Sequence, residues 1–84
     1  MYLGEKATQE GDLVKLKVVL ATNIKELRKA KGMAQERLAL DAGVDRTLVS
    51  KIERLVANPS LEIMAKLANT LDVSVSKLLT EKKR

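Results

Sequence analysis

The sequence contains no cysteine and no histidine. Without these side chains the chain has no disulfide, no thiolate or imidazole metal ligand, and no cysteine or histidine for catalysis. It also has no glycine-rich loop of the kind that cradles phosphates, and its carboxylates are scattered among lysines and arginines. We therefore expect no enzyme, no catalytic residue, no metal site, no cofactor and no small-molecule ligand.

Aromatic residues are almost absent, with one tyrosine, Tyr2, and no phenylalanine or tryptophan. The core must therefore be aliphatic. At 84 residues the chain suffices for one small domain, which buries about 60–65% of the surface of its unfolded chain. No apolar run approaches the roughly 20 residues that span a bilayer, and the N-terminus lacks a signal-peptide pattern. We expect no membrane association and a cytoplasmic, nucleoid-associated location in a prokaryote.

Positive charge is in modest excess. The 16 lysines and arginines outnumber the 11 aspartates and glutamates, which gives a net charge of +5. This balance favours an acidic partner such as nucleic acid. Many soluble proteins are this basic, so the net charge alone does not identify nucleic acid as the partner.

A long amphipathic pattern opens the ordered part of the chain. Asp12 is placed to cap it, and Gly32 is placed to end it. Its apolar residues recur at steps of three or four: Leu13, Leu16, Leu20, Ile24 and Leu27. The pattern predicts a helix over about 13–31. We expect the residues before it, 1–11, to form a flexible arm.

We take the domain to span 12–79. After the first helix, its sequence pattern predicts four shorter helices and no strand. The expected fold is therefore all-α with five helices. Ser60 and Ser74 are suitable N-caps for the last two helices. The fourth helix has a broad apolar face, whose predicted inner stripe is Leu61, Met64, Ala65, Ala68 and Leu71, with Ile63 and Leu67 to one side. The later helices are expected at 34–42, 46–54, 61–71 and from about 75, followed by a charged tail at 80–84.

Two of these helices lie in the stretch 33–54 (MAQERLALDAGVDRTLVSKIER), separated by Gly43. Glycine readily takes the left-handed conformation that ends one helix and redirects the chain, and Asp45 can accept the free N–H groups of the next helix. At ~100° per residue, Val49 and Ile52 share the inner face of the second helix. Its outer face carries Arg46, Thr47, Ser50, Lys51 and Arg54. This arrangement predicts a helix-turn-helix whose second helix is free to enter the major groove of DNA.

The chain resembles the Cro and lambda-repressor type of helix-turn-helix family, which is common in phage and bacterial regulators. The resemblance covers roughly 20–79 and implies a lambda-repressor-like DNA-binding domain with the helix-turn-helix at its second and third helices. The matching segments, which are specific as an ordered set, are NIKELR (23–28), KGMAQE (31–36), LA (38–39), AGV (42–44), VSKIER (49–54), NPSL (58–61) and LDVS (71–74).

The resemblance also implies roles for individual residues. Gln35 would clamp the DNA backbone and reach an outer base pair, and Arg46 could make a bidentate contact with guanine. Lys51 suits a guanine or a phosphate, and Leu48 suits a thymine methyl or the neighbouring helix. The predicted DNA-binding residues are Gln35, Arg46, Thr47, Ser50, Lys51 and Arg54.

Three further residues concern how the second helix of this motif, the recognition helix (46–54), is held in place. In the resembling family, the positions of Arg28 and Glu53 form a partly buried ion pair that ties the first helix to the third. Leu55 stands where the family commonly has glycine, just past the recognition helix. Because leucine does not adopt left-handed geometry cheaply, we expect the helix to run on a little or the loop to be built differently.

The function that follows is sequence-specific binding of double-stranded DNA by a transcriptional regulator. One recognition helix reads only a few base pairs, so we expect a homodimer on an operator with two half-sites about 34 Å apart. The apolar residues after the recognition helix and along the last two helices are the candidates for the pairing surface: Leu55, Val56, Ile63, Leu67 and Leu79.

Several subtypes remain open at this stage. The run from Val44 to Arg54 looks similar to controller proteins of restriction–modification systems, while small phage repressors and antitoxin-type regulators share the same features. A different hypothesis is a protein-binding helical module without DNA affinity, which would use the apolar stretch 55–57. Retention on heparin or random DNA at low salt distinguishes this module from a DNA-binding regulator.

Overall fold

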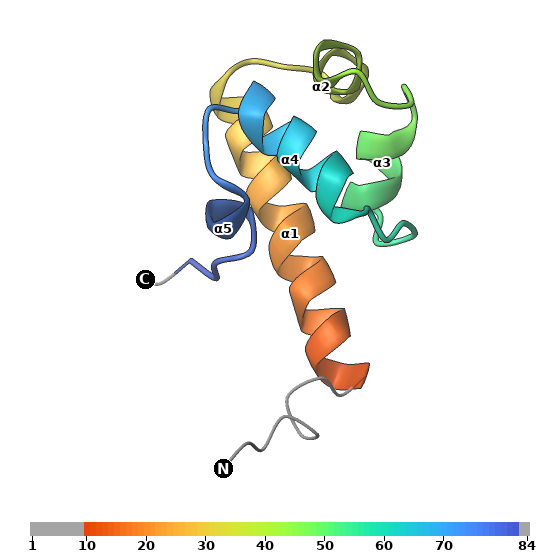
Figure 1. The fold of residues 1–84 in the computed structure, drawn as a ribbon, viewed down its shortest axis with the longest axis vertical. Helices are drawn as coiled ribbons and strands as arrows, with labels where there is room; N and C mark the ends of the chain where they lie inside the picture. The colour runs from red at the N-terminus through yellow and green to blue at the C-terminus, as the bar shows by residue number, and fades with distance from the viewer. Residues whose placement is uncertain (1–9, 83–84) are drawn as a thin grey trace.

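The structure is a computed structural model that describes residues 10–82. Within that range the chain forms helices and loops only, as the sequence predicts (Figure 1). The helices are α1 (Glu10–Ala30), α2 (Gln35–Ala42), α3 (Leu48–Glu53), α4 (Leu61–Thr70) and α5 (Val75–Leu78). Most of the expected N-terminal arm, residues 1–9, and residues 83–84 lie outside the described residues.

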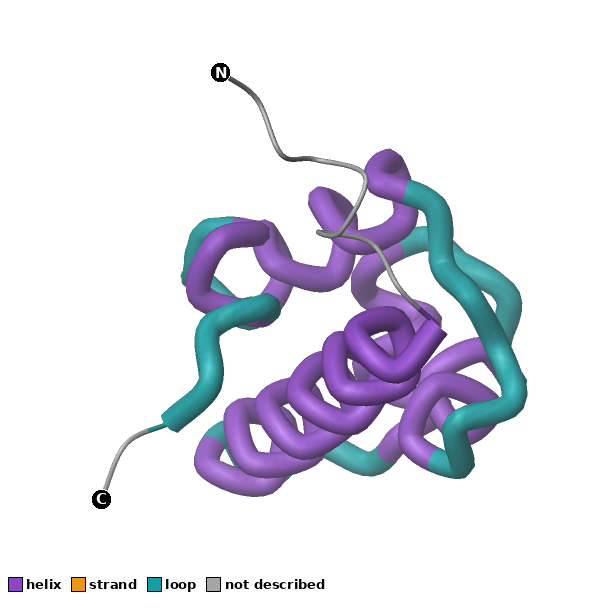
Figure 2. Tube along the Cα trace, turned by 90° about the horizontal axis from the view of Figure 1, so that it is seen from below, coloured by secondary structure: helices purple, strands orange, loops and turns teal. Residues whose placement is uncertain are grey.

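The long helix α1 is the element around which the others are arranged. Its 21 residues span about 31 Å at 1.5 Å per residue. It already includes Glu10 and Gly11, so Asp12 lies within the helix and is not the N-cap that the sequence predicted. The C-terminal half of α1 lies among the other helices, whereas its N-terminal half projects beyond them (Figure 1). Figure 2 is seen from below, towards this projecting end, and shows the other helices around α1.

The core is small and aliphatic, as the shortage of aromatic residues requires. The helix α1 packs against α3 and α5, and α2 packs against α3 and α4. Side chains from all five helices therefore meet at one centre. The buried apolar side chains are Leu20, Ala21, Ile24, Leu38, Ala39, Val49, Ile52, Leu67, Ala68, Leu71 and Leu78.

The inward face of α4 differs from the predicted one. Leu67 is fully buried in the core, whereas Leu61 is 70% exposed and Ala65 also faces solvent. Because the helix carries many apolar residues, its periodicity is compatible with two different inward faces. The two faces are related by a small rotation about the helix axis. Contact with α2 and α5 selects the face with Leu67 and Ala68. Leu67 fills the core of its own chain, so its prediction as a pairing residue is wrong.

Four helices end in the same way, with one residue in the left-handed conformation after the last turn. These residues are Gly32 after α1, Gly43 after α2, Leu55 after α3 and Asp72 after α4. In each case the N–H of the next residue donates to a carbonyl five positions back, at 2.9–3.0 Å. These local closures determine where each helix stops and turn the chain back towards the core.

Leu55 is the unusual member of this set. Its φ is 66°, and the N–H of Val56 donates to the carbonyl oxygen of Lys51 at 2.9 Å. The expectation that leucine would lengthen the helix or change the loop is therefore wrong. The chain keeps the turn and holds a leucine in a conformation that costs an L-residue with a side chain about 1–2 kcal/mol.

Candidate DNA-binding surface

The helices α2 and α3 form the predicted helix-turn-helix. Leu38 and Ala39 of α2 and Val49 and Ile52 of α3 are buried in the shared core. The chain turns between them at Gly43, whose φ of 73° is left-handed as the sequence predicts. The inner sides of both helices are thus held by packing, and their outer sides are left at the surface.

The start of α3 is built around Asp45. The Oδ1 atom of Asp45 accepts the backbone N–H of Thr47 at 2.8 Å and the Thr47 hydroxyl at 2.6 Å. These hydrogen bonds from Thr47, together with the positive charges of Lys51 and Arg46, hold the pKa of the Asp45 carboxyl below its ordinary value. Regular α3 begins at Leu48, two residues later than predicted, so Arg46 and Thr47 form the turn that leads into it. The N-cap is Thr47, and Asp45 binds the N–H of this turn residue instead of capping the helix as predicted.

The residues predicted to face DNA do lie at the surface. Arg46, Thr47, Lys51 and Arg54 are exposed, and Ser50 is partly exposed. A guanidinium nitrogen of Arg46, Nη2, lies 3.6 Å from Glu36 Oε2 of α2, with both side chains largely in solvent. An ion pair this exposed contributes little to stability, so it leaves Arg46 available to another partner.

Leu48 is placed by packing. It is partly buried and lies against the core cluster. The sequence left open whether Leu48 contacts a thymine methyl or a neighbouring helix. In the structure it packs against the protein's own core. Its apolar side chain helps to hold the first turn of α3 in place beneath the exposed polar side chains.

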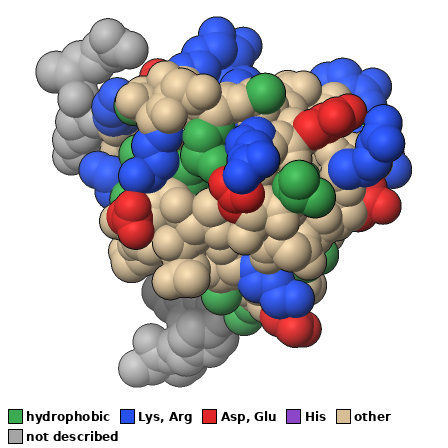
Figure 3. Space-filling view, turned by 90° about the horizontal axis from the view of Figure 1, so that it is seen from above, with side chains coloured by type: hydrophobic (Ala, Val, Ile, Leu, Met, Phe, Trp, Pro, Cys, Tyr) green, Lys and Arg blue, Asp and Glu red, His purple; other side chains and the backbone are tan. Residues whose placement is uncertain are grey.

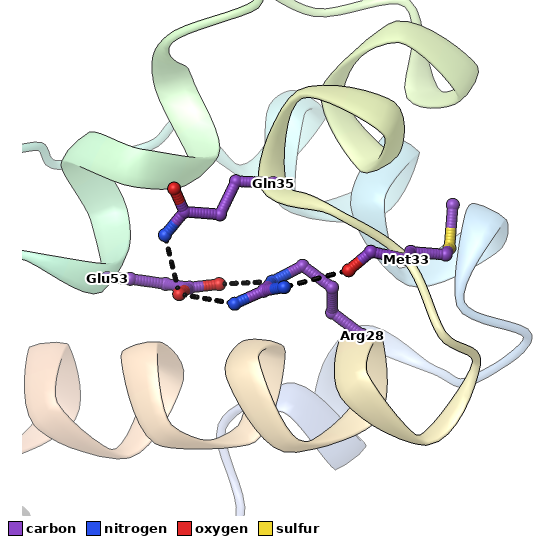
Figure 4. Close-up of polar contacts among 4 residues, drawn as sticks. All are labelled: Arg28, Met33, Gln35 and Glu53. Carbon is purple, nitrogen blue, oxygen red and sulfur yellow. Dashed lines mark hydrogen bonds and ion pairs between the residues drawn. The ribbon is translucent and has the colours of Figure 1, made fainter.

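The helix α3 is joined to α1 by the ion pair that the resemblance implies. Arg28 Nε donates to Glu53 Oε2 at 2.8 Å, and Arg28 Nη2 donates to Glu53 Oε1 at 3.0 Å (Figure 4). The third nitrogen, Nη1, donates to the carbonyl of Met33 at 2.7 Å. The two side chains are only 9% and 6% exposed. This bidentate pair fixes the C-terminal end of α3 against α1 and the loop before α2.

Gln35 joins the same cluster. Its Nε2 donates to Glu53 Oε1 at 2.9 Å (Figure 4), a contact that sequence reasoning missed. Burial by itself raises the pKa of the Glu53 carboxyl. The hydrogen bonds from Arg28 and Gln35, with the charges of Arg28 and Lys25, outweigh burial and hold that pKa below its ordinary value. The start of α2 and the end of α3 thus share one ionised carboxylate.

Asn23 is a second polar residue that sequence reasoning missed. It is buried, and its Nδ2 atom donates to the carbonyls of Leu78 and Thr80, both at 2.9 Å, and to that of Lys77 at 3.3 Å. Its side chain therefore caps the C-terminal end of α5 from α1. The available signal was a polar residue on the apolar stripe of α1, three positions after Leu20.

The charges on the helix-turn-helix end of the molecule are mixed. Seen from the end that carries α2, lysine and arginine side chains surround the face, with carboxylates between them (Figure 3). Glu36 and Asp41 of α2 lie close to Arg46 and Arg37, at 3.6 Å and 3.2 Å. The positive potential is therefore locally compensated on α2.

The four predicted pairing residues other than Leu67 fall into two groups. Leu55 and Val56 are exposed, whereas Ile63 and Leu79 are partly buried against the core. Leu79 also lines an apolar groove of about 220 Å³ that opens beside the projecting half of α1. The other residues that line it are Leu13, Leu16, Lys17, Leu20, Asn58, Pro59 and Met64.

Residues 10–82 contain neither a membrane-crossing helix nor a metal-binding cluster. Among these residues, none of the helices is both long and apolar enough to cross a bilayer. In the same part of the chain, no three acidic, histidine or cysteine side chains gather in a way that would hold a metal ion.

Comparison of sequences relates the chain to known regulators. The sequence profile of the helix-turn-helix family HTH_3 matches residues 24–78. The HTH-type transcriptional regulator SinR of Bacillus subtilis (strain 168) is 45% identical over 65 residues, which make up 76% of this chain and 59% of SinR. The chain thus spans less than two thirds of the length of that relative.

Several solved structures are similar to this chain in both fold and sequence, among them the following two. The restriction–modification controller protein C.AhdI from Aeromonas hydrophila has a TM-score of 0.70 and 42% identity, over 74% of this chain and 94% of that one. The biofilm-formation regulator SinR, in a crystal structure with DNA, has a TM-score of 0.68 and 44% identity, over 73% of this chain and 98% of that one.

Proposed function

This chain belongs to the helix-turn-helix family HTH_3, and we propose that it is a sequence-specific transcriptional regulator that binds double-stranded DNA as a homodimer. The observation that carries the proposal is the division of α3 into two faces. Val49 and Ile52 anchor it in the core, while Lys51 on its other face, and Arg46 in the turn before it, are exposed to solvent. A helix held in this way can lie in a major groove without unfolding any part of its own domain.

The likeness to relatives supports the same function. SinR was crystallised in complex with DNA, and it is 44% identical to this chain over the matched region. C.AhdI is a restriction–modification controller, which agrees with the similarity seen in the stretch 44–54. A restriction endonuclease gene and a methyltransferase gene beside the gene for this chain would assign it to the controllers.

We assign base contacts to the start of α3 and phosphate contacts to its flanks. Arg46 is long enough for a bidentate contact to guanine O6 and N7. Ser50, Lys51 and Arg54 follow along the exposed side and supply donors for bases and phosphates. Gln35 keeps its second amide hydrogen and its carbonyl oxygen for DNA, because one hydrogen is already donated to Glu53. Its orientation is thereby set before DNA arrives.

Homodimer formation is proposed because one short helix reads only part of an operator. The exposed Leu55 and Val56 and the partly buried Ile63 and Leu79 supply apolar surface for pairing. Two-fold pairing would place half-sites 10–10.5 base pairs apart, about one helical turn. Sedimentation of the chain over a range of concentrations, alone and with duplex DNA, tests the pairing.

The DNA-binding proposal is tested by selection of bound sequences from random duplex DNA. We expect an enriched sequence with two related half-sites, and binding that weakens as salt rises. Lys51→Ala should reduce the slope of log affinity against log salt by about 0.9 if Lys51 contacts a phosphate. The matched control is Lys77→Ala on α5, which removes the same charge from another part of the surface. A folded chain that ignores DNA at low salt would contradict the proposal and favour a protein-binding module.

A further inference from the structure

The hydroxyl group of Thr47 already uses its hydrogen within the protein. The Thr47 Oγ1 atom lies 2.6 Å from Asp45 Oδ1, and the Thr47 backbone N–H donates to the same oxygen at 2.8 Å. A hydroxyl has one hydrogen to donate and two lone pairs that accept. The direction of the bond to Asp45 therefore decides what Thr47 can offer to a ligand.

That direction is set by the charge of Asp45. An ionised carboxylate only accepts hydrogen bonds. The pKa of the Asp45 carboxyl is held below its ordinary value by the two bonds from Thr47 and by Lys51 and Arg46, so the group is ionised at neutral pH. Because Asp45 has no hydrogen to give, Thr47 must be the donor, and its lone pairs are what remain for the solvent side.

Thr47 is exposed between Arg46 and the first turn of α3, on the surface proposed to enter the major groove. In that groove guanine presents the acceptors O6 and N7, and thymine presents the acceptor O4. Adenine and cytosine present the donor amino groups N6 and N4. Phosphate oxygens are acceptors. A hydroxyl that can only accept is complementary to the amino groups of adenine and cytosine. It cannot form a hydrogen bond with guanine O6 or N7, thymine O4 or a phosphate oxygen, because all of these are acceptors.

We propose that Thr47 is a specificity-determining residue that accepts a hydrogen bond from the amino group of an adenine or a cytosine, with Asp45 as the residue that fixes its polarity. This inference rests on the proposed DNA-binding function. It assigns to Thr47 a base contact and excludes a contact in which its hydroxyl donates to a phosphate.

The test is selection from random duplex DNA with five proteins: wild type, Thr47→Val, Thr47→Ser, Asp45→Asn and Asp45→Ala. Valine has the shape of threonine without the hydroxyl, and serine keeps it. Asparagine keeps an Oδ1 acceptor for both bonds, whereas alanine releases the hydroxyl to rotate and donate. Wild type should prefer adenine or cytosine at one position of each half-site by roughly 2- to 12-fold, the range of one neutral hydrogen bond.

Thr47→Ser and Asp45→Asn should keep this preference. Thr47→Val should lose it at that position alone, and Asp45→Ala should tolerate guanine or thymine there. A uniform loss of affinity in Thr47→Val with all base preferences intact would overturn the inference, because it would mean a backbone contact. Retained adenine or cytosine preference in Asp45→Ala would overturn the role of Asp45. An enriched wild-type operator in either case would leave the proposed function standing, whereas failure to enrich any sequence would remove both.

Discussion

Replacement of Glu53 by alanine tests how the recognition helix is held. Glu53 accepts three hydrogen bonds, two from Arg28 and one from Gln35, at 2.8–3.0 Å. The substitution leaves the Arg28 guanidinium, on a side chain that is 9% exposed in the intact protein, with the carbonyl of Met33 as its remaining partner among these contacts. The change therefore strands a buried charge and removes little apolar surface.

The expected cost follows from that stranded charge. Removal of one partner from a buried ion pair costs about 3–5 kcal/mol of unfolding free energy. The whole domain, at 84 residues, should have a stability of roughly 4–12 kcal/mol. Glu53→Ala should therefore remove at least about a quarter of the domain's stability. The double variant Arg28→Met/Glu53→Met should be less destabilised than the sum of its two single variants, because it leaves neither charge behind.

Urea unfolding followed by circular dichroism measures these differences in free energy. The control is Lys66→Ala, which breaks the exposed pair of Lys66 with Glu62 on α4 and should cost less than about 0.5 kcal/mol. A loss below about 0.5 kcal/mol for Glu53→Ala would refute the reasoning. It would mean that water screens the pair in solution.

The same carboxylate predicts a pH dependence. The pKa of Glu53 is lowered in the folded state from its ordinary value of 4.5, so the unfolded chain binds the proton more tightly. The stabilisation from its ionised form is fully present above about pH 4.5 and is lost as pH falls through the lower folded pKa. Urea unfolding from pH 6 to pH 3 should show a shallower acid loss in Glu53→Gln than in wild type. Parallel curves for the two proteins would contradict this linkage.

Further predictions concern the turns and the cap on α5. Leu55→Gly should raise the unfolding free energy by up to about 1 kcal/mol, because relief of left-handed strain exceeds the added entropy of the unfolded chain; an unchanged urea midpoint would count against strain at this site. Gly43→Ala should lower it by about 1–2 kcal/mol for the converse reason, although the space around Gly43 is open, and calorimetry measures the shift. Asn23→Ala should cost about 1–3 kcal/mol, because it strips a donor from buried carbonyls of α5. Faster amide hydrogen exchange in α5, in excess of the change in α2, would be its local signature.

Much of the helix-turn-helix could be predicted because its signals are local. Gly43 ends α2 in the conformation that glycine favours, and Asp45 accepts hydrogen bonds at the turn into α3. The two inward residues, Val49 and Ile52, follow from helical periodicity alone. The pair of Arg28 and Glu53 came from family resemblance, since residues 25 positions apart carry no signal of contact in their spacing.

Other features could not be predicted because they depend on contacts between distant segments. In the sequence, Asn23 is an ordinary polar residue within the apolar stripe of α1. Its role as a donor to α5 becomes visible only when α5 lies beside α1. Leu55 is a separate case: it violates a sound local rule, and the hydrogen bond from the Val56 N–H to the Lys51 carbonyl closes its turn. The buried face of α4 was misassigned because neighbouring helices, rather than periodicity, choose between two apolar faces of similar width.

The sequence by itself determined the family, the five helices found in residues 10–82, and the residues exposed on α3 and beside it, because caps, glycines and helical periodicity act over a few residues. The tertiary structure decided which side chains of α4 enter the core, how Gln35 joins the carboxylate of Glu53, and which carbonyls accept hydrogen bonds from Asn23. Those outcomes depend on which side chains and polar groups of distant segments meet in the folded chain. That meeting depends on the relative placement of helices, which no local pattern encodes.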